Sequence, residues 1–177
     1  MNKKIILDLC GGTGTWSEPY KNAEYDVRNI TLPNYDIRTY KPPKNVYGIL
    51  AAPPCTEFSV AKNGKRDFPG ALEIVRACLD IIWEYPHLHF WALENPRGML
   101  SRFLGRAPYY FEQWEFGGNR RKPTALWGRF DKPKKTVFIK PEILAPWPEK
   151  GEVRKTRAQT RAITPPGFAR AFFLANK

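Results

Sequence analysis

The sequence predicts one α/β domain, a doubly wound β-sheet with helices on both of its faces. Three observations predict this fold class. The length of 177 residues suits a single domain with a full core. Short apolar runs alternate with helical patterns through the first hundred residues. The composition, 42% hydrophobic and 14% aromatic, is that of a globular protein and not of a disordered one.

Short apolar or alternating runs predict the strands, at residues 4–9, 25–32, 36–38, 46–52 and 89–93. The run at 46–52 is the most continuous, so we expect it near the centre of the sheet. Two later strands, 111–116 and 136–139, are predicted to be antiparallel.

Helical signals lie between and after these runs. Ser17 is a suitable N-cap and Pro19 fits a first turn, which predicts a helix over 17–22. Apolar residues at helical spacing predict a helix over 69–85, a shorter one over 97–104 and a last one after Pro165. The segment 125–157 is rich in proline and basic residues, and it predicts a small appended lobe.

The net charge of +12 and the pI near 9.8 favour a polyanionic partner, nucleic acid before an acidic membrane surface. The excess lies late in the chain, because residues 119–161 hold thirteen Lys/Arg and four Asp/Glu. A phosphate-contacting surface and an ordinary solvated face both explain this pattern.

The cysteines, Cys10, Cys55 and Cys78, show no CxxC spacing, so neither a disulfide framework nor a zinc site is predicted. His87 and His89 alone make a weak metal signal. The first apolar stretch is too short for a signal peptide or a membrane span, and a reducing cytoplasm is expected.

Pro53-Pro54-Cys55 directly follows the apolar run 46–52, so it is expected at the carboxyl end of a strand, where ligands bind in open α/β sheets. A second run ends in Glu94-Asn95-Pro96. The two motifs predict a nucleophile and a proton donor at neighbouring strand ends. The alternative is that Cys55 is an inert small hydrophobic residue.

The first predicted strand ends in Asp8-Leu9-Cys10-Gly11-Gly12-Thr13-Gly14. Glycines at such a turn let a nucleotide-like cofactor approach the backbone. A dinucleotide fingerprint needs a further glycine where Ser17 stands, and no acidic residue closes the second strand, so an NAD site is disfavoured. A plain loop remains the other interpretation.

At these segments the chain resembles the DNA cytosine-5 methyltransferases, a family with a Rossmann-like S-adenosylmethionine-binding sheet. The similarity covers nearly the whole chain, in the family's order, and includes compact versions found in phage-type members. It rests on four segments: residues 7–14, residues 52–59, residues 93–96, and residues 121–124 together with 164–173.

The resemblance implies that Cys55 is the nucleophile and that Glu94 holds the Watson–Crick edge of a flipped cytosine. Arg121 is implied to bind the base oxygen, and Asn95 to support the turn that carries Cys55. A thiolate adding at carbon 6 makes carbon 5 nucleophilic enough to accept a methyl group. Further substrate contacts are expected from Arg120 and from a basic loop, 62–66, that includes Lys65 and Arg66, although a merely solvated loop explains that segment equally.

For the cofactor, the resemblance implies S-adenosyl-L-methionine, or a modified relative of it. Gly12 and Gly14 are expected to line its methionine end and Asp36 to hydrogen-bond its adenine. The remaining residues expected in this site are Asp8, Cys10 and Pro54.

The chain also departs from the family pattern. The region for target recognition, 125–157, is short, so recognition is weak, is made by a few residues, or is supplied by a partner. Candidate DNA contacts there, which equally suit the core and rim of a small sheet, are Trp127, Arg129, Lys132, Lys134 and Lys135.

Alternatives to DNA cytosine methylation stay open. Methylation of exocyclic amino groups is disfavoured, because Ala52 and Cys55 flank the two prolines where such enzymes have polar and aromatic residues. A non-catalytic or split-enzyme relative is a third hypothesis, and RNA as the substrate is a fourth.

Overall fold

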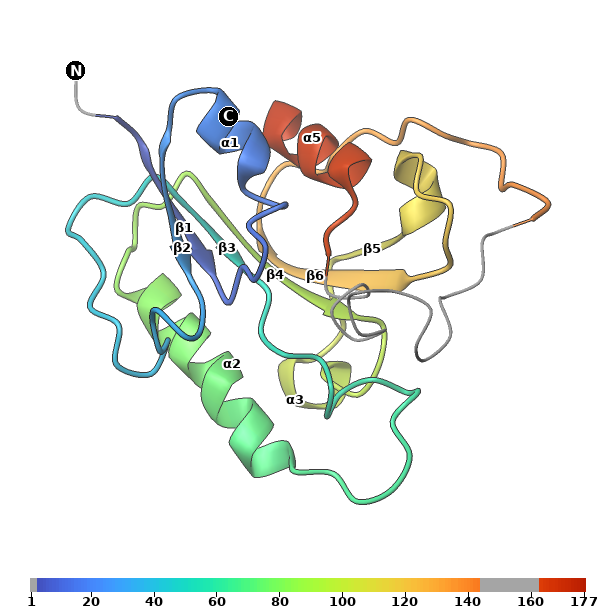
Figure 1. Cartoon of the computed structure of the whole chain (residues 1–177), viewed down its shortest axis with the longest axis horizontal. Coiled ribbons are helices and arrows are strands. Elements are labelled where there is room, and N and C mark those ends of the chain that lie inside the picture. The colour runs from blue at the N-terminus through green and yellow to red at the C-terminus, as the bar shows by residue number, and fades with distance from the viewer. Residues whose placement is uncertain (1–2, 144–162) are drawn as a thin grey trace.

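Six strands form one sheet in the described part of the chain, residues 3–143 and 163–177 of the computed structural model (Figure 1). The strands are β1 Ile5–Leu9, β2 Asp26–Ile30, β3 Gly48–Ala51, β4 Phe90–Pro96, β5 Tyr109–Glu112 and β6 Pro123–Arg129. Their order is β2-β1-β3-β4-β6-β5. β1 to β4 run parallel to one another, whereas β6 is antiparallel to both of its neighbours, β4 and β5. The mixed α/β class and the interior position of the run at 46–52 are therefore confirmed.

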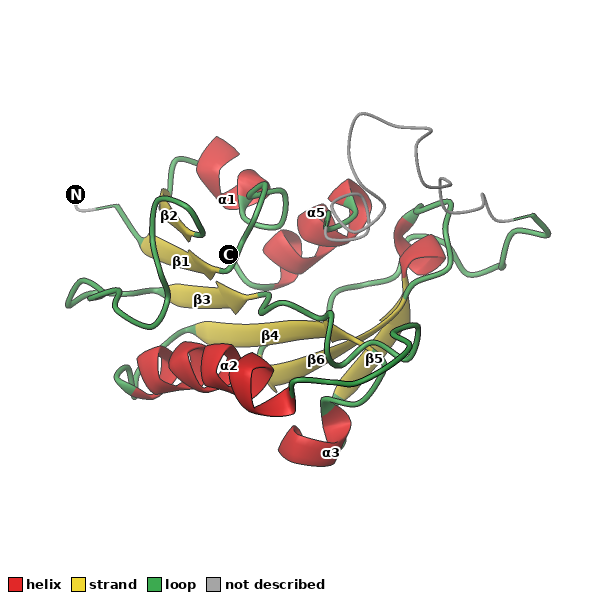
Figure 2. Cartoon of the chain, turned by 60° about the horizontal axis from the view of Figure 1, so that its bottom comes forward, coloured by secondary structure: helices red, strands yellow, loops and turns green. Residues whose placement is uncertain are grey.

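Helices cover both faces of this sheet (Figure 2). α2 Phe68–Trp83 and the single turn α3 Ser101–Leu104 lie on one face, and α1 Glu18–Asn22 and α5 Pro166–Ala175 lie on the other. A 3₁₀ turn, η1 Gln113–Phe116, follows β5. Asp67 caps α2, because its Oδ1 accepts a hydrogen bond from the Gly70 amide at 3.0 Å.

Alternation along the strands divides the core into two layers. Leu7 and Ile49 face the α2 layer, while Ile6 and Leu50 face the opposite layer. The second layer is aromatic: Trp16 and Phe172 meet edge to face, with ring centroids 5.4 Å apart. The helix after Pro165 thus closes the face that the first helix begins to cover.

Two predicted strands are wrong. Residues 36–38 lie in a loop and turn that is anchored by the buried Ile37 and has no partner strand in the sheet. Residues 136–139 form no strand either, and Phe138 and Ile139 are more than three-quarters exposed. The amides of Thr136 and Val137 both donate to the Glu115 carbonyl, so this segment is attached to the 3₁₀ turn by backbone hydrogen bonds.

β6 was not predicted, and it changes the interpretation of the appended lobe. Residues 125–129 belong to the central sheet, where Trp127 is buried and donates from Nε1 to the Gly105 carbonyl at 3.0 Å. Arg129 donates to the Leu88 carbonyl. The expected lobe does not begin at 125, and its residues 144–157 lie outside the described residues.

The strand order reverses at β1. β2 pairs with β1 on one side, and β3, the next strand in the sequence, pairs with β1 on the other side; both pairings are parallel. The connection after β1 runs through α1 on one face of the sheet, and the connection after β3 runs through α2 on the other. In open α/β sheets, ligands bind at the carboxyl ends of two such strands. The glycine turn follows β1 and the Cys55 segment follows β3. The topology therefore brings the two motifs to the same edge of the sheet.

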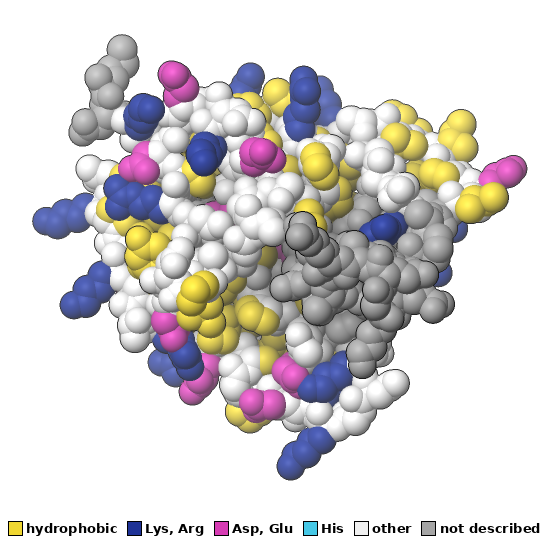
Figure 3. Space-filling view, viewed as in Figure 1, with side chains coloured by type: hydrophobic (Ala, Val, Ile, Leu, Met, Phe, Trp, Pro, Cys, Tyr) yellow, Lys and Arg dark blue, Asp and Glu magenta, His cyan; other side chains and the backbone are white. Residues whose placement is uncertain are grey.

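Lysine and arginine side chains lie on several sides of the face shown in Figure 3, and acidic side chains stand among them. The charge of +12 is thus not gathered into one patch on this face. In the described part of the chain, none of the helices combines the length and apolar character that a membrane crossing requires.

Candidate active site

The turn that carries Cys55 is held by the neighbouring strand. Asn95, fully buried near the end of β4, donates from Nδ2 to the Pro53 carbonyl at 3.1 Å. Cys55 itself is half-buried, and its carbonyl accepts hydrogen bonds from the amides of Phe58 and Ser59. The contact expected of Asn95 is present, and the thiol stands on a tight turn beside the end of β4.

The segment after β4 packs against the same turn. The Met99 amide donates to the Phe58 carbonyl at 2.8 Å. A Cβ added to Gly98 would lie 2.4 Å from that carbonyl oxygen, so only glycine allows this close approach. The Pro-Cys and Glu-Asn motifs, forty residues apart in the sequence, are therefore fixed to each other by backbone contacts.

Glu94 forms an ion pair with Lys122, whose Nζ lies 3.5 Å from Oε1. Both side chains are largely withdrawn from solvent, with 13% of Glu94 and 8% of Lys122 exposed. Lys122 directly precedes β6, and the antiparallel pairing of β6 with β4 returns it to the end of β4. The sequence analysis does not identify Lys122, although it lies in the Arg-Lys-Pro-Thr segment beside the predicted Arg121.

Arg121 lies differently. Its side chain is 75% exposed, and its Nε is 4.0 Å from Glu112 Oε1. Arg120 is half-buried. Lys122 is thus the cation beside Glu94, while the base-oxygen contact expected of Arg121 and the substrate contact expected of Arg120 stay predictions.

The glycine turn after β1 has an unusual backbone. Cys10, Gly12 and Gly14 all have positive φ, at 56°, 55° and 72°. Asn29 at the end of β2 donates from Nδ2 to the Gly12 carbonyl at 3.1 Å and fixes the turn. A Cβ added to Gly12 would meet no atom within 4 Å, so the backbone there faces open space. This surface suits a ligand that approaches the main chain closely.

Asp8 does not line that surface. It is fully buried, and its Oδ2 accepts a hydrogen bond from the Ser17 hydroxyl at 2.6 Å. Its carboxyl group lies under Gly11, where an added Cβ would come within 2.3 Å of Asp8 Cγ. Burial raises the pKa of Asp8 to about 6, against the smaller opposing effect of the Ser17 hydrogen bond. The expectation that Asp8 binds the cofactor is corrected: it supports the turn from below.

The Cys10 side chain is also turned inward. Its Sγ lies 4.0 Å from Cys78 Sγ on α2, and its amide donates to the Ile30 carbonyl at 2.7 Å. The hydrogen bond with Cys78 lowers the pKa of the Cys10 thiol and raises that of Cys78. The thiol of Cys10 therefore contacts the α2 layer, and a ligand would meet the backbone of this residue.

Asp36 lies in a loop and not at a strand end. Its carboxylate accepts hydrogen bonds from the Arg38 amide at 3.0 Å and from the guanidinium Nε at 2.9 Å. The side-chain bond with Arg38, and then the amide bond, hold the pKa of Asp36 down to about 2. The side chain is 30% exposed, so an adenine contact would be made by a carboxylate already paired with Arg38, and that contact stays a prediction. Pro54, exposed beside Cys55, also keeps its predicted role.

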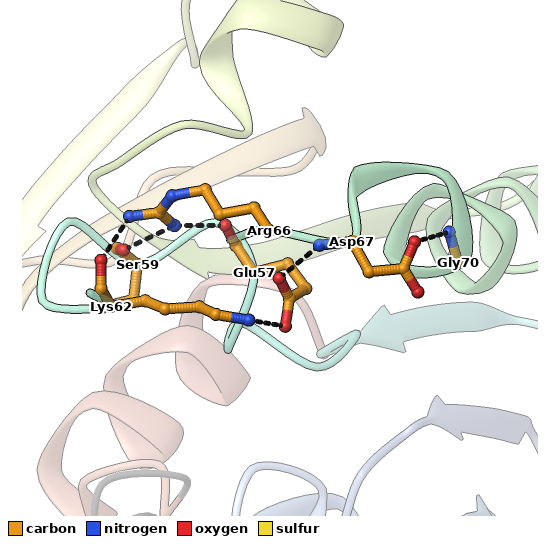
Figure 4. Close-up of polar contacts among 6 residues, drawn as sticks. All are labelled: Glu57, Ser59, Lys62, Arg66, Asp67 and Gly70. Carbon is orange, nitrogen blue, oxygen red and sulfur yellow. Dashed lines mark hydrogen bonds and ion pairs between the residues drawn. The ribbon is translucent and has the colours of Figure 1, made fainter. Parts of the chain in front are cut away.

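The basic loop after Cys55 is folded on itself (Figure 4). The Arg66 guanidinium donates to three backbone carbonyls of the loop, those of Glu57, Ser59 and Lys62. Lys62 pairs with Glu57, whose Oε2 accepts a hydrogen bond from the Asp67 amide at 2.8 Å. Arg66 therefore stabilises the loop from within, and its expected role as a substrate contact is wrong for this conformation. Lys65 is exposed, and its predicted substrate contact stays a prediction.

The candidate DNA contacts after residue 126 fall into two groups. The side chains of Trp127 and Arg129 are engaged with backbone carbonyls, as described above. Lys135 pairs with Glu115, and Lys132 and Lys134 are exposed. Arg129 is nevertheless exposed, so it presents charge at the surface together with the lysines, whereas Trp127 is buried.

A scan of the chain against protein-family models found no match, and a search of the curated proteins found none either. The chemical argument therefore rests on the motifs and on their geometry.

Proposed function

We propose that the chain is an S-adenosylmethionine-dependent DNA cytosine-5 methyltransferase with a Rossmann-like fold. One observation carries the proposal: the Asn95–Pro53 hydrogen bond joins the Glu94 strand end to the Cys55 turn. A nucleophile and a carboxyl group are thereby held at adjacent strand ends, on the same edge of the sheet as the glycine turn. Such an edge is where α/β sheets bind their ligands.

In this proposal the Cys55 thiolate adds to carbon 6 of a cytosine that has been flipped out of the duplex. The Glu94 carboxyl group, in its protonated form, donates a hydrogen bond to ring nitrogen 3 and accepts one from the exocyclic amine, which draws electron density away from carbon 6 and favours the addition. Lys122 holds the Glu94 carboxyl group in place and adds positive charge beside the base. Once carbon 5 carries the transferred methyl group, a base removes the remaining proton from carbon 5. The electron pair of that C–H bond expels the Cys55 sulfur and restores the aromatic ring.

The glycine turn fits S-adenosylmethionine on one structural ground, since the backbone at Gly12 is open to close approach. Gly12 and Gly14 would hold its methionine end, and the Asp36 carboxylate would accept a hydrogen bond from its adenine. When bound, the cofactor supplies an electrophilic methyl group. Asp8 and Asn29 act on this site indirectly, by fixing the turn from below and from β2.

The decisive test is incubation with labelled S-adenosylmethionine and cytosine-containing DNA, followed by digestion and mapping of the methylated base. We expect 5-methylcytosine, and we expect Cys55→Ser to abolish its formation while cofactor binding survives. Methyl groups found on the exocyclic nitrogen would exclude the thiolate mechanism.

A trapping experiment tests the nucleophile directly. DNA that carries 5-fluorocytosine should form a stable adduct, and peptide mapping should place it on Cys55. Cys78→Ala is the matched control, because it removes a buried thiol of α2 and should leave the adduct intact. An active enzyme that forms no adduct would contradict the proposal. An RNA oligonucleotide that is methylated in preference to DNA would instead identify RNA as the substrate.

A further inference from the structure

A groove of about 740 Å³ opens beside the Cys55 turn, between the end of β4 and α3. We call it the α3 groove. It is lined by Val60 of the loop after Cys55, by the segment Arg97–Met99, and by Ser101, Arg102, Arg106, Tyr110 and Pro123. Its volume lies within the range of ligand-binding clefts.

The α3 groove is strongly basic. Arg97, Arg102 and Arg106 line it, all three are exposed, and none of the described residues that line it is acidic. The Arg97 guanidinium lies over the Tyr110 ring, 5.6 Å from its centroid, and is thus held toward the groove by an aromatic face. Three guanidinium groups in such a lining are suited to bind anionic groups. A planar guanidinium can donate two parallel hydrogen bonds to two oxygens of one phosphate.

Backbone contacts place this groove against the candidate active site. The Arg97 amide donates to the Pro123 carbonyl at 2.9 Å, next to Lys122. The Met99 amide donates to the Phe58 carbonyl, in the turn that begins at Cys55. A polymer whose base entered the site between Cys55 and Glu94 would therefore run its backbone past these arginines.

We infer that the α3 groove binds backbone phosphates of the nucleic-acid strand that carries the target base. The identity of that base rests on the proposed function, but the phosphate contacts do not. A second basic surface lies on the opposite face of the sheet, with Lys132, Lys134 and Arg170, but it includes Asp131 and a lysine that is already paired with Glu115. The described lining of the α3 groove includes no such opposing charge, and the groove lies beside the Cys55 turn.

The test compares two variants with the same loss of three positive charges. One is Arg97→Gln/Arg102→Gln/Arg106→Gln, and the matched control is Lys132→Gln/Lys134→Gln/Arg170→Gln. The probe is a fluorescein-labelled 20-base-pair DNA duplex, and its anisotropy is measured over a range of salt concentrations without cofactor. Each phosphate contact contributes about 0.9 to the slope of log K against log salt and roughly eightfold to affinity at 0.1 M salt.

We expect the groove variant to lose about two to three units of slope and at least tenfold in affinity at 0.1 M salt, while the control loses less than one unit. Arg97 contacts Tyr110, so the double variant Arg102→Gln/Arg106→Gln provides a readout that leaves this contact intact. It should lose about two units of slope with an unchanged urea midpoint. Equal losses in the groove variant and the control, or unchanged binding in the double variant, would overturn the inference.

These outcomes are separate from those of the methylation assay. A protein that transfers no methyl group but binds DNA through the α3 groove would retain the inference and refute the proposed function. An active methyltransferase whose DNA affinity is unchanged by substitution of these arginines would retain the proposed function and refute the inference.

Discussion

At the scale of single residues, two of the carboxyl groups around the candidate site, Asp8 and Asp36, are in opposite electrostatic situations. Burial raises the pKa of Asp8, whereas Arg38 lowers the pKa of Asp36. Asp8 also has one oxygen, Oδ1, that is buried and accepts no hydrogen bond from the described residues. A carboxylate in this position is costly for folding, which is typical of residues kept for a site and not for stability.

The raised pKa of Asp8 makes a prediction about pH. The unfolded chain releases this proton near its ordinary pKa of 3.8, while the folded chain holds it until about pH 6. The folded state binds more protons in that window, so the free energy of unfolding falls as pH rises from about 4 to about 6 and stays lower above it. Asp8→Asn removes this loss and should stabilise the protein at pH 7.5 by up to about 3 kcal/mol.

Urea unfolding of both proteins at pH 4.5 and pH 7.5 measures this effect. The advantage of the variant should be much larger at pH 7.5. An advantage that is independent of pH would show that the Asp8 carboxyl group titrates normally in the folded state.

Lys122 yields a second prediction at this scale. Removing one member of a largely buried ion pair leaves the other charge desolvated and unpaired. Lys122→Met should therefore lower the free energy of unfolding by about 3 kcal/mol or more. The double variant Glu94→Gln/Lys122→Met should recover much of this loss, because no charge is then stranded. Lys122→Arg is the control that keeps the charge.

A double-mutant cycle by urea unfolding gives the coupling energy of this pair. Coupling below about 0.5 kcal/mol would mean that the two side chains do not act together. If Lys122 positions Glu94, methyl transfer should fall in Lys122→Met and be partly retained in Lys122→Arg.

At the scale of elements, the parallel half of the sheet was predictable and the antiparallel half only in part. The antiparallel strand predicted at 111–116 overlaps β5 Tyr109–Glu112, but residues 113–116 form η1, and β6 was not predicted. β1, β2, β3 and β4 have apolar or alternating runs bounded by loop residues. β6 begins with Pro123 and contains Gly128, two residues that argue against a strand. Gly128 is required there, because a Cβ would lie 2.1 Å from the Trp91 carbonyl oxygen.

The false strand at 136–139 failed for the opposite reason. Its residues have high strand propensity, but propensity decides little where no neighbouring strand offers a partner and a buried face. The candidate site follows the same division. Cys55, Asn95 and the glycines lie where the motifs indicated, whereas Lys122 reaches Glu94 only through the pairing of β6 with β4.

At the scale of the whole molecule, the two sides of the sheet are closed by different means. α2 covers one side, and the other depends on α5, from the end of the chain, packing against α1 from its beginning. Phe168 is fully buried and stacks on Phe111, with ring centroids 4.1 Å apart. The backbone at Gly167 is pressed against the Phe116 carbonyl.

This arrangement predicts a large effect of a substitution far from the site. Phe168→Ala should lower the free energy of unfolding by about 3 to 5 kcal/mol, because it leaves a cavity in the aromatic layer. Leu174→Ala is the matched control on the same helix, since Leu174 is more than half exposed and should change stability by less than about 0.5 kcal/mol. Equal effects in chemical denaturation would show that α5 is not packed as described.

The pairing of α1 with α5 also bears on how the chain folds during its synthesis. Trp16 and Tyr20 leave the ribosome some 150 residues before the helix that covers them. At about 5 to 20 residues per second, their apolar surface waits roughly 8 to 30 s for its cover. Nascent chains are therefore expected to expose the apolar surface of α1 and its face of the sheet, and to be prone to aggregation, until α5 has been translated. They are expected to need chaperone protection during that interval.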